Sequence, residues 1–256
     1  MQAERIPHGK LSFCFTPDEE IGHGADHFNH ERFAADWAYT LDGGMEGEVE
    51  YENFNADAAV VEITGCNVHP GTAKDTMKNA LTMGMEFNAM LPAGEVPERT
   101  EGYEGFYHLH RYEGTVERVV MEYIIRDHDI RSFEARGKTL RLIEKLMNEK
   151  YGAGTVKLTI KAQYRNMAEL IKPCFHLVEN AVDAAKEAGV EPKVVPIRGG
   201  TDGARLSYEG LPCPNLGVGG FAYHGPYEHV SIEGMDAAVE IALGLVRRYA
   251  QMPRPE

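Results

Sequence analysis

The feature that most constrains the fold of this chain is the order of hydrophobic patterns between residues 56 and 163. Alternating apolar and polar residues predict strands, and apolar residues at helical spacing predict helices. The segments in order are a strand at 58–64, a helix at 74–91, strands at 106–113 and 116–126, a helix at 130–150 and a strand at 155–161. This order, β-α-β-β-α-β, predicts a split βαβ, or ferredoxin-like, module.

Each helix of this module is expected to turn one apolar side toward the sheet. In the longer helix, at 130–150, we assign that side to the following five residues: Phe133, Leu140, Leu142, Ile143 and Leu146.

The sequence on either side of the module reads as a second structural layer. Before it, strands are expected at 10–16 and 36–42, with a short helix at about 25–35. After it, the expected elements are a helix at 170–189, strands at 194–197 and 215–219, and a helix at 232–249. Helices that alternate with short apolar strands are typical of an α/β sheet. We therefore predict an α/β domain made of residues 1–53 and 168–256, with residues 54–167 inserted as a second domain.

Charge and cysteine usage exclude several classes of protein. The formal net charge is −14, from 26 basic and 40 acidic residues, which disfavours binding to nucleic acids or anionic membranes. No run of 18 uncharged apolar residues is present, so no membrane span is expected. Four widely spaced cysteines and no signal-peptide pattern predict a reduced, cytoplasmic protein.

Two groups of carboxylates follow expected strands in the first 50 residues. Asp18-Glu19-Glu20 comes after the strand at 10–16, and neighbouring side chains in an extended segment point to opposite sides. One carboxylate of such a pair could hold a metal ion while the other faces substrate or water. Asp42-Gly43-Gly44 ends the next strand, where α/β sheets bind ligands. A solvated acidic turn and a plain glycine turn are the alternative interpretations.

Three loops in the rest of the chain carry further candidates. Arg198 opens a glycine-rich loop before a short helix, and its guanidinium fits a carboxylate bidentately. His224 lies in a glycine-flanked loop after the strand at 215–219, as a metal ligand could. His69 follows the first strand of the inserted module. The alternatives are a surface ion pair for Arg198, a structural histidine at 224 and a simple turn at 69.

Taken together, these segments resemble the peptidase T family of tripeptide aminopeptidases, within the dinuclear zinc exopeptidases. The resemblance rests on motifs that run in order along almost the whole chain: FTPDEEIGHGA (15–25), WAYTLDGG (37–44), ENFNA (52–56), NVHPGTAK (67–74), EGYEGFYHL (101–109), GTVERVVMEYIIRD (114–127), PIRGGTDGA (196–204), GLPCPNL (210–216) and YHG (223–225). It implies a zinc-binding α/β catalytic domain with an inserted lid that often mediates homodimer contacts.

The resemblance also implies roles for individual residues. Glu19 resembles the general base that activates a metal-bound water. Glu20 and His224 look like ligands of one zinc ion, and Asp42 looks like a ligand of the other. Three residues resemble substrate-binding positions, and the last of them is the weakest match: Arg198, His69 and Asn166.

The sequence departs from the family pattern before residue 10. The family carries a His-x-Asp motif and a bridging Asp upstream of the segment that matches here, and neither is found before Glu19. We therefore expect a catalytic domain that lacks its N-terminal portion, with three of five metal ligands and impaired release of N-terminal residues from short peptides. The alternative is a non-catalytic fragment whose lid serves as a dimerisation module.

Overall fold

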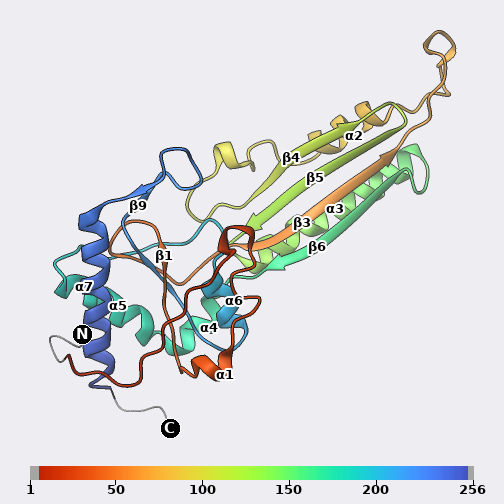
Figure 1. The fold of residues 1–256 in the computed structure, drawn as a ribbon. Coiled ribbons are helices and arrows are strands. Elements are labelled where there is room, and N and C mark those ends of the chain that lie inside the picture. Colours follow the sequence, from red (N-terminus) through yellow and green to blue (C-terminus); the bar gives the residue numbers. More distant parts are fainter. Residues whose placement is uncertain (1–5, 253–256) are drawn as a thin grey trace. The chain divides into compact units, whose positions relative to one another are not determined.

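The computed structural model describes residues 6–252, which divide into two compact units (Figure 1). Unit 1 contains the residues up to Asn53 and those from Asn166 onward, and unit 2 is Phe54–Arg165. The chain returns to unit 1 two residues earlier than the expected position 168. The reason lies in hydrogen bonds: the Asn53 side chain accepts from the Met167 amide at 2.8 Å, and the Asn166 side chain accepts from the Asn53 amide at 3.2 Å.

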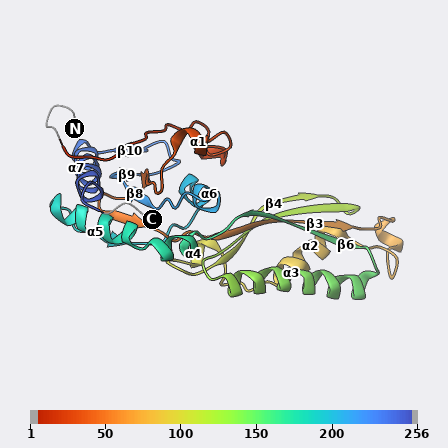
Figure 2. The same ribbon diagram turned by 90° about the horizontal axis from the view of Figure 1, so that it is seen from below.

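Unit 2 has the β-α-β-β-α-β order that the sequence predicts. Its elements are β3 (Asn55–Thr64), α2 (Ala80–Ala89), β4 (Phe106–Gly114), β5 (Arg118–Asp127), α3 (Ile130–Tyr151) and β6 (Val156–Tyr164). The four strands form an antiparallel sheet in the order β4-β5-β3-β6, which is the ferredoxin-like arrangement. Figure 2 shows α2 and α3 on the same face of this sheet.

The core of unit 2 lies between the two helices and that face of the sheet. Val61 and Ile63 of β3 are fully buried there, together with Phe87 of α2. On α3 the buried side includes Phe133, Leu140, Ile143 and Met147, whereas Leu142 and Leu146 are 55% and 45% exposed. The assignment of the last two to the apolar side is therefore wrong. Successive helical residues are about 100° apart, so Leu142 points about 200° away from Leu140.

Unit 1 contains a short mixed sheet. Its strands, in spatial order, are β1 (Thr40–Gly43), β8 (Asn215–Gly217), β2 (Glu48–Glu50) and β7 (Lys193–Val194). β1 runs parallel to β8, and β2 runs antiparallel to β8 and parallel to β7. Beyond β8, the strands β9 (Gly220–Phe221) and β10 (His229–Val230) form a separate two-stranded ribbon. The α/β class is as expected, although β2 was not predicted.

Helices α5 (His176–Glu187) and α7 (Ile232–Tyr249) pack against each other in unit 1. A Cβ added at Gly244 of α7 would lie 3.1 Å from the Ala184 Cβ, so the two helices approach closely at this glycine. α7 matches the predicted range 232–249. The single helix expected at 170–189 is instead divided into α4 (Ala168–Ile171), a 3-10 turn at Lys172–Cys174 and α5, because Pro173 supplies no backbone N–H.

The expected strand at 10–16 is not a strand in the structure. Its polar side chains hold it to unit 1: the Lys10 ammonium donates to the Ala34 carbonyl at 3.3 Å, and the Ser12 hydroxyl donates to the Phe33 carbonyl at 2.7 Å. The apolar residues point outward, with Phe13 73% and Phe15 95% exposed. No strand among residues 6–252 pairs with this segment, so its alternation of polar and apolar residues does not produce a strand.

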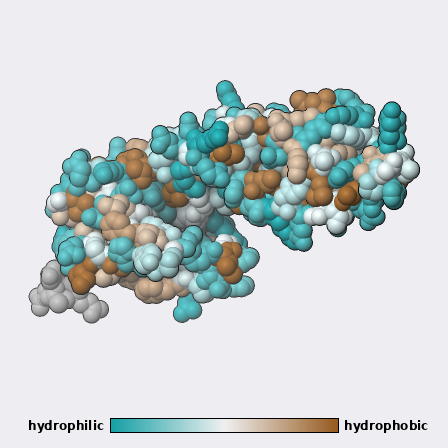
Figure 3. All heavy atoms as spheres, turned by 90° about the horizontal axis from the view of Figure 1, so that it is seen from above, coloured by the Kyte–Doolittle hydropathy of each residue, from teal (hydrophilic) through white to brown (hydrophobic). Residues whose placement is uncertain are grey.

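The expected helix at 25–35 is also reduced, to the single turn α1 (His30–Phe33). No helix within the described range is long and apolar enough to cross a membrane. On the face drawn in Figure 3, apolar residues are scattered in small groups among polar ones.

The closed core of unit 2 predicts that residues 54–165 fold without the rest of the chain. This fragment should unfold in one cooperative thermal transition. Within it, Phe87→Ala should cost about 3–5 kcal/mol because the ring is fully buried, whereas Met85→Ala on the exposed side of α2 should cost less than about 0.5 kcal/mol. Random-coil circular dichroism of the fragment, or equal costs for the two variants, would contradict the prediction.

The buried carboxylate of Glu50 predicts a pH dependence of stability in unit 1. Burial raises the pKa of Glu50 from its ordinary 4.5 to about 7, so the folded chain retains this proton after the unfolded chain has lost it. The free energy of unfolding should therefore fall as the pH rises from about 4.5 to about 7. Over that interval, the free energy of unfolding of Glu50→Gln, measured with urea, should rise by about 3 kcal/mol relative to that of the wild type. The exposed Glu240→Gln of α7 serves as the control, and a pH-independent difference for Glu50→Gln would rule out the effect.

Candidate active site

The chain segment with Glu19 and Glu20 is a single 3-10 turn, Glu19–Ile21 (η1), in unit 1. Asp18 precedes this turn in the left-handed region, at φ 62°, and Gly22 ends it at φ 74°. A left-handed backbone at a residue other than glycine costs free energy and is concentrated at functional sites. The turn places the two glutamates in succession outside any longer helix or strand.

His224 lies in the loop that joins β9 to β10. Its backbone amide donates to the Glu228 carboxylate at 2.8 Å, and both His224 and Ala222 have positive φ, at 59° and 56°. The Tyr223 hydroxyl donates to the Gly43 carbonyl at 3.1 Å. This hydrogen bond ties the loop to the end of β1, directly beside Asp42.

The side chains of Glu20 and His224 meet. The Glu20 Oε2 atom is 2.8 Å from the His224 Nε2 atom, and both side chains are largely exposed, at 68% and 75%. An exposed ion pair contributes little to stability. The contact is therefore important because it places a carboxylate oxygen beside an imidazole nitrogen, and both groups are of a kind that binds zinc.

Glu19 lies in a group of negative charges. Its pKa is raised from 4.5 to about 7, first by burial and then by the charges of Asp42, Asp202 and Glu20, while His224 opposes the shift. The pKa of Asp42 is also raised, by desolvation and by Asp202 and Glu20, although Asp42 remains open to solvent. A carboxylate with a pKa near 7 is suited to accept and return a proton at neutral pH.

Asp202 is the residue of this site that the sequence did not single out for chemistry. It is 7% exposed and is the first residue of α6 (Asp202–Tyr208). Within the motif it is typical of a helix cap, but the cap is Thr201, whose hydroxyl accepts from the Gly203 amide at 3.2 Å. Its burial is seen only in the structure, so no signal in the sequence separated it from an ordinary residue at the start of a helix.

The described residues do not form a complete metal site. No group of three or more His, Cys, Asp or Glu side chains between residues 6 and 252 is placed to hold a metal ion. Glu20 and His224 bring one carboxylate and one imidazole to the same point, and Asp42 is not placed to complete a group of three. Catalytic zinc ordinarily has three protein ligands and a water.

The three residues expected to bind substrate have different surroundings. Arg198 is half-buried in the loop between β7 and α6. In unit 1, the side-chain oxygen of Asn166 accepts hydrogen bonds from two backbone amides, those of Asn53 and Ala168. In unit 2, His69 is exposed before the 3-10 turn Pro70–Thr72, and its Nδ1 atom accepts from the Gly71 amide at 3.1 Å.

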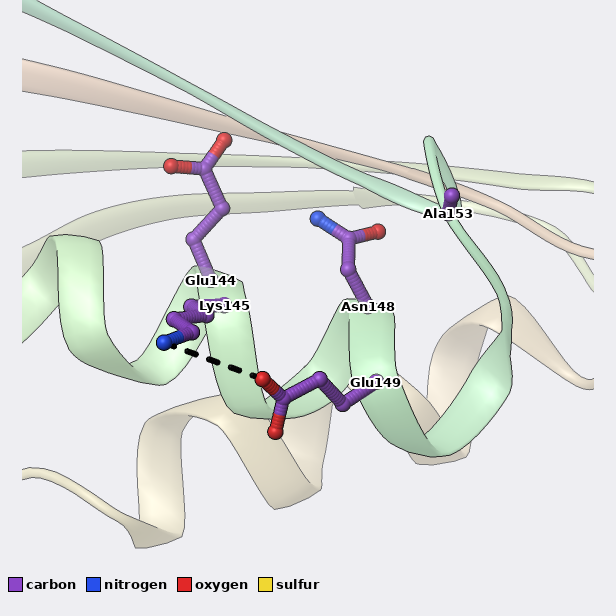
Figure 4. Close-up of a pocket in the computed structure, with 5 residues that line it drawn as sticks. All are labelled: Glu144, Lys145, Asn148, Glu149 and Ala153. Carbon is purple, nitrogen blue, oxygen red and sulfur yellow. Dashed lines mark ion pairs between the residues drawn. The ribbon is translucent and has the colours of Figure 1, made fainter.

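A shallow pocket beside α3 is not a ligand site of this kind (Figure 4). Asn148, which lines it, exchanges two hydrogen bonds with the backbone of Val156, at 2.8 and 2.9 Å. Glu144 accepts from the Leu158 amide at 2.8 Å, and Lys145 pairs with Glu149 at 3.8 Å. These polar groups attach β6 to the helix or pair along it.

Sequence comparison with known proteins finds one matching family and several relatives that are described as Peptidase T. The chain matches peptidase family M20/M25/M40 over residues 1–248. It is 54% identical to Peptidase T of Caldanaerobacter subterraneus subsp. tengcongensis and 56% identical to Peptidase T of Clostridium perfringens, each over 246 residues. These alignments cover 96% of this chain and 60% and 61% of the relatives, so the chain spans about 60% of their length.

Solved structures confirm the expected fold. Aminopeptidase PepT from Bacillus cereus superposes with a TM-score of 0.84 at 24% identity, and a tripeptidase from Staphylococcus aureus with 0.87 at 22%. Each comparison covers 98% of this chain and 67% of the other. A Bacillus subtilis protein described as a dinuclear metal-binding peptidase of the M20 family matches with a TM-score of 0.67 at 16% identity. By its sequence match along nearly its whole length, the chain belongs to peptidase family M20/M25/M40.

Proposed function

We propose that this chain carries the general base, part of the metal-ligand set and the substrate-binding residues of a tripeptide aminopeptidase. The observation that carries the proposal is the contact between Glu20 and His224 beside Glu19, a carboxylate whose pKa is about 7. The Peptidase T relatives, at 54% and 56% identity, support the reaction class.

In this proposal Glu19 handles the proton of the reaction. Its carboxylate accepts a proton from the attacking water and delivers it to the amine that leaves with the rest of the peptide. Arg198 offers a planar donor fork for a substrate carboxylate, and we propose His69 and Asn166 as further substrate contacts.

We propose zinc as the metal because carboxylate and imidazole together are typical zinc ligands. Glu20 and His224 form one partial site, and Asp42 belongs to a second. Because the described chain has too few ligands for either site, we propose that this chain alone binds zinc weakly and hydrolyses tripeptides poorly.

The missing ligands, in this proposal, come from protein chain outside these 256 residues. The segment at 10–16 supports this view, because its outward side carries Leu11, Phe13 and Phe15, which are 37%, 73% and 95% exposed. A segment that exposes an apolar residue at every second position is suited to pair with another strand.

Two further proposals concern partners and location. Unit 2 acts as the lid, and its edge strands β4 and β6 are available for pairing with a second copy of the chain. The protein works in the cytoplasm, which fits four cysteines that are all free thiols: Cys14, Cys66, Cys174 and Cys213.

The test combines zinc titration calorimetry with a tripeptide hydrolysis assay on the purified chain. Zinc binding should be weak, and His224→Ala should weaken it by about tenfold or more because one of two ligands is lost. His110→Ala, an exposed histidine of unit 2, should leave it unchanged. Residual hydrolysis should be far below that of the Clostridium perfringens relative assayed in parallel, and Glu19→Gln should abolish it.

Two results would count against this function. Zinc affinity that does not respond to His224→Ala would remove the proposed ligand pair. Hydrolysis at the level of the relative would show that the described ligands suffice, and if Glu19→Gln retained that activity, the base would be assigned incorrectly.

A further inference from the structure

The segment that carries Glu19 and Glu20 has little regular structure of its own. Between residues 8 and 29 the only helical element is the three-residue turn η1. Its position must therefore be set by side-chain contacts with other parts of unit 1. The strongest candidate for such a contact is the buried carboxylate of Asp202.

Asp202 contacts the chain both before and after the turn η1. Its Oδ2 atom accepts a hydrogen bond from the Thr16 hydroxyl at 3.1 Å. On the other side, Gly24 approaches so closely that an added Cβ would lie 1.9 Å from the same oxygen. Thr16 precedes Glu19 by three residues and Gly24 follows Glu20 by four, so the carboxylate contacts both flanks of the turn.

The rest of α6 continues this contact along the chain. Arg205 pairs with Asp26, and Glu209, which follows the helix, contacts the His30 ring with 2.9 Å between Oε2 and Nε2. Positions 202, 205 and 209 lie on one side of a helix. The two later contacts are partly exposed and add little individually, so the buried contact of Asp202 is the decisive one.

The start of α6 is itself fixed to the sheet. The Thr201 hydroxyl donates to the Asn215 side chain of β8 at 2.9 Å. Gly203 has no room for a side chain, because a Cβ would lie 2.4 Å from the Cys213 carbonyl. β8 continues directly into the β9–β10 ribbon, whose loop contains His224. Both α6 and the His224 loop are therefore positioned by β8.

We propose that Asp202 is a positioning residue: its carboxylate fastens the turn that bears Glu19 and Glu20 to α6, so that Glu20 meets His224. The catalytic meaning of this role rests on the proposed function. The attachment itself does not, because it is a property of the chain without metal or substrate.

Hydrogen exchange of the purified chain tests the attachment at the amides of Gly22 and His23, which close the turn by donating to the Glu19 and Asp18 carbonyls at 2.7 and 3.0 Å. Asp202→Ala and Thr16→Val should each speed this exchange by about tenfold, since each removes one partner of the part-buried hydrogen bond between Thr16 and Asp202. The double variant should exchange no faster than either single one.

Conservative variants separate positioning from general destabilisation. Thr16→Ser keeps the hydroxyl and Asp202→Asn keeps a side-chain oxygen acceptor, so both should restore slow exchange. Asp236→Ala, an exposed carboxylate of α7, is the matched control, and the amides of α7 should keep their wild-type rates in every variant. If Asp202→Ala does not fold, Thr16→Val alone still tests the attachment.

The outcomes distinguish this inference from the proposed function. Wild-type exchange at Gly22 and His23 in Thr16→Val and Asp202→Ala would overturn the positioning role, whatever the zinc titration gives. Faster exchange, with zinc binding weakened in Asp202→Ala and recovered in Asp202→Asn, is the expected result. Faster exchange in a chain that binds no zinc would uphold the attachment and refute the metal site.

Discussion

The parallel pairing of β1 with β8 is the constraint on which the candidate site depends. It places Thr40 opposite Asn215 and Gly43 opposite Gly217, so the strand with Asp42 ends beside the strand that leads to the His224 loop. Asn215 is 2% exposed and accepts hydrogen bonds from Thr40 of β1 and from Thr201 before α6. One buried amide thus holds together the sheet edge with Asp42 and the helix with Asp202.

The sequence predicted best the elements whose pattern is local. α7 and the six elements of unit 2 follow from periodicity, although α2 begins at Ala80 because residues before it make turns and a bridge between Cys66 and Lys78. The segment at 10–16 shows the limit of the same reasoning. Alternation indicates an extended backbone, but a strand also needs a neighbour, and no local signal reveals whether one is present.

The residues of the site also fall into those that the sequence could predict and those that it could not. The carboxylates at 19, 20 and 42 and the histidine at 224 could be selected from their motifs, and the structure brings Glu20 and His224 together. Asp202 could not be selected, because its importance comes from burial against Thr16 and Gly24, which are about 180 residues away in sequence. Its charge also contributes to the raised pKa of Glu19, so electrostatics and placement at this turn depend on one residue.

The proposed function requires that Glu20 and His224 together hold a metal ion. X-ray absorption spectroscopy of the zinc-loaded chain tests this claim directly, because it counts the imidazole ligands around the metal. We expect one imidazole nitrogen, with oxygen atoms of carboxylate and water in the remaining positions, and loss of the imidazole signal in His224→Ala. Two or more imidazoles, a sulfur ligand, or an unchanged spectrum in His224→Ala would contradict it.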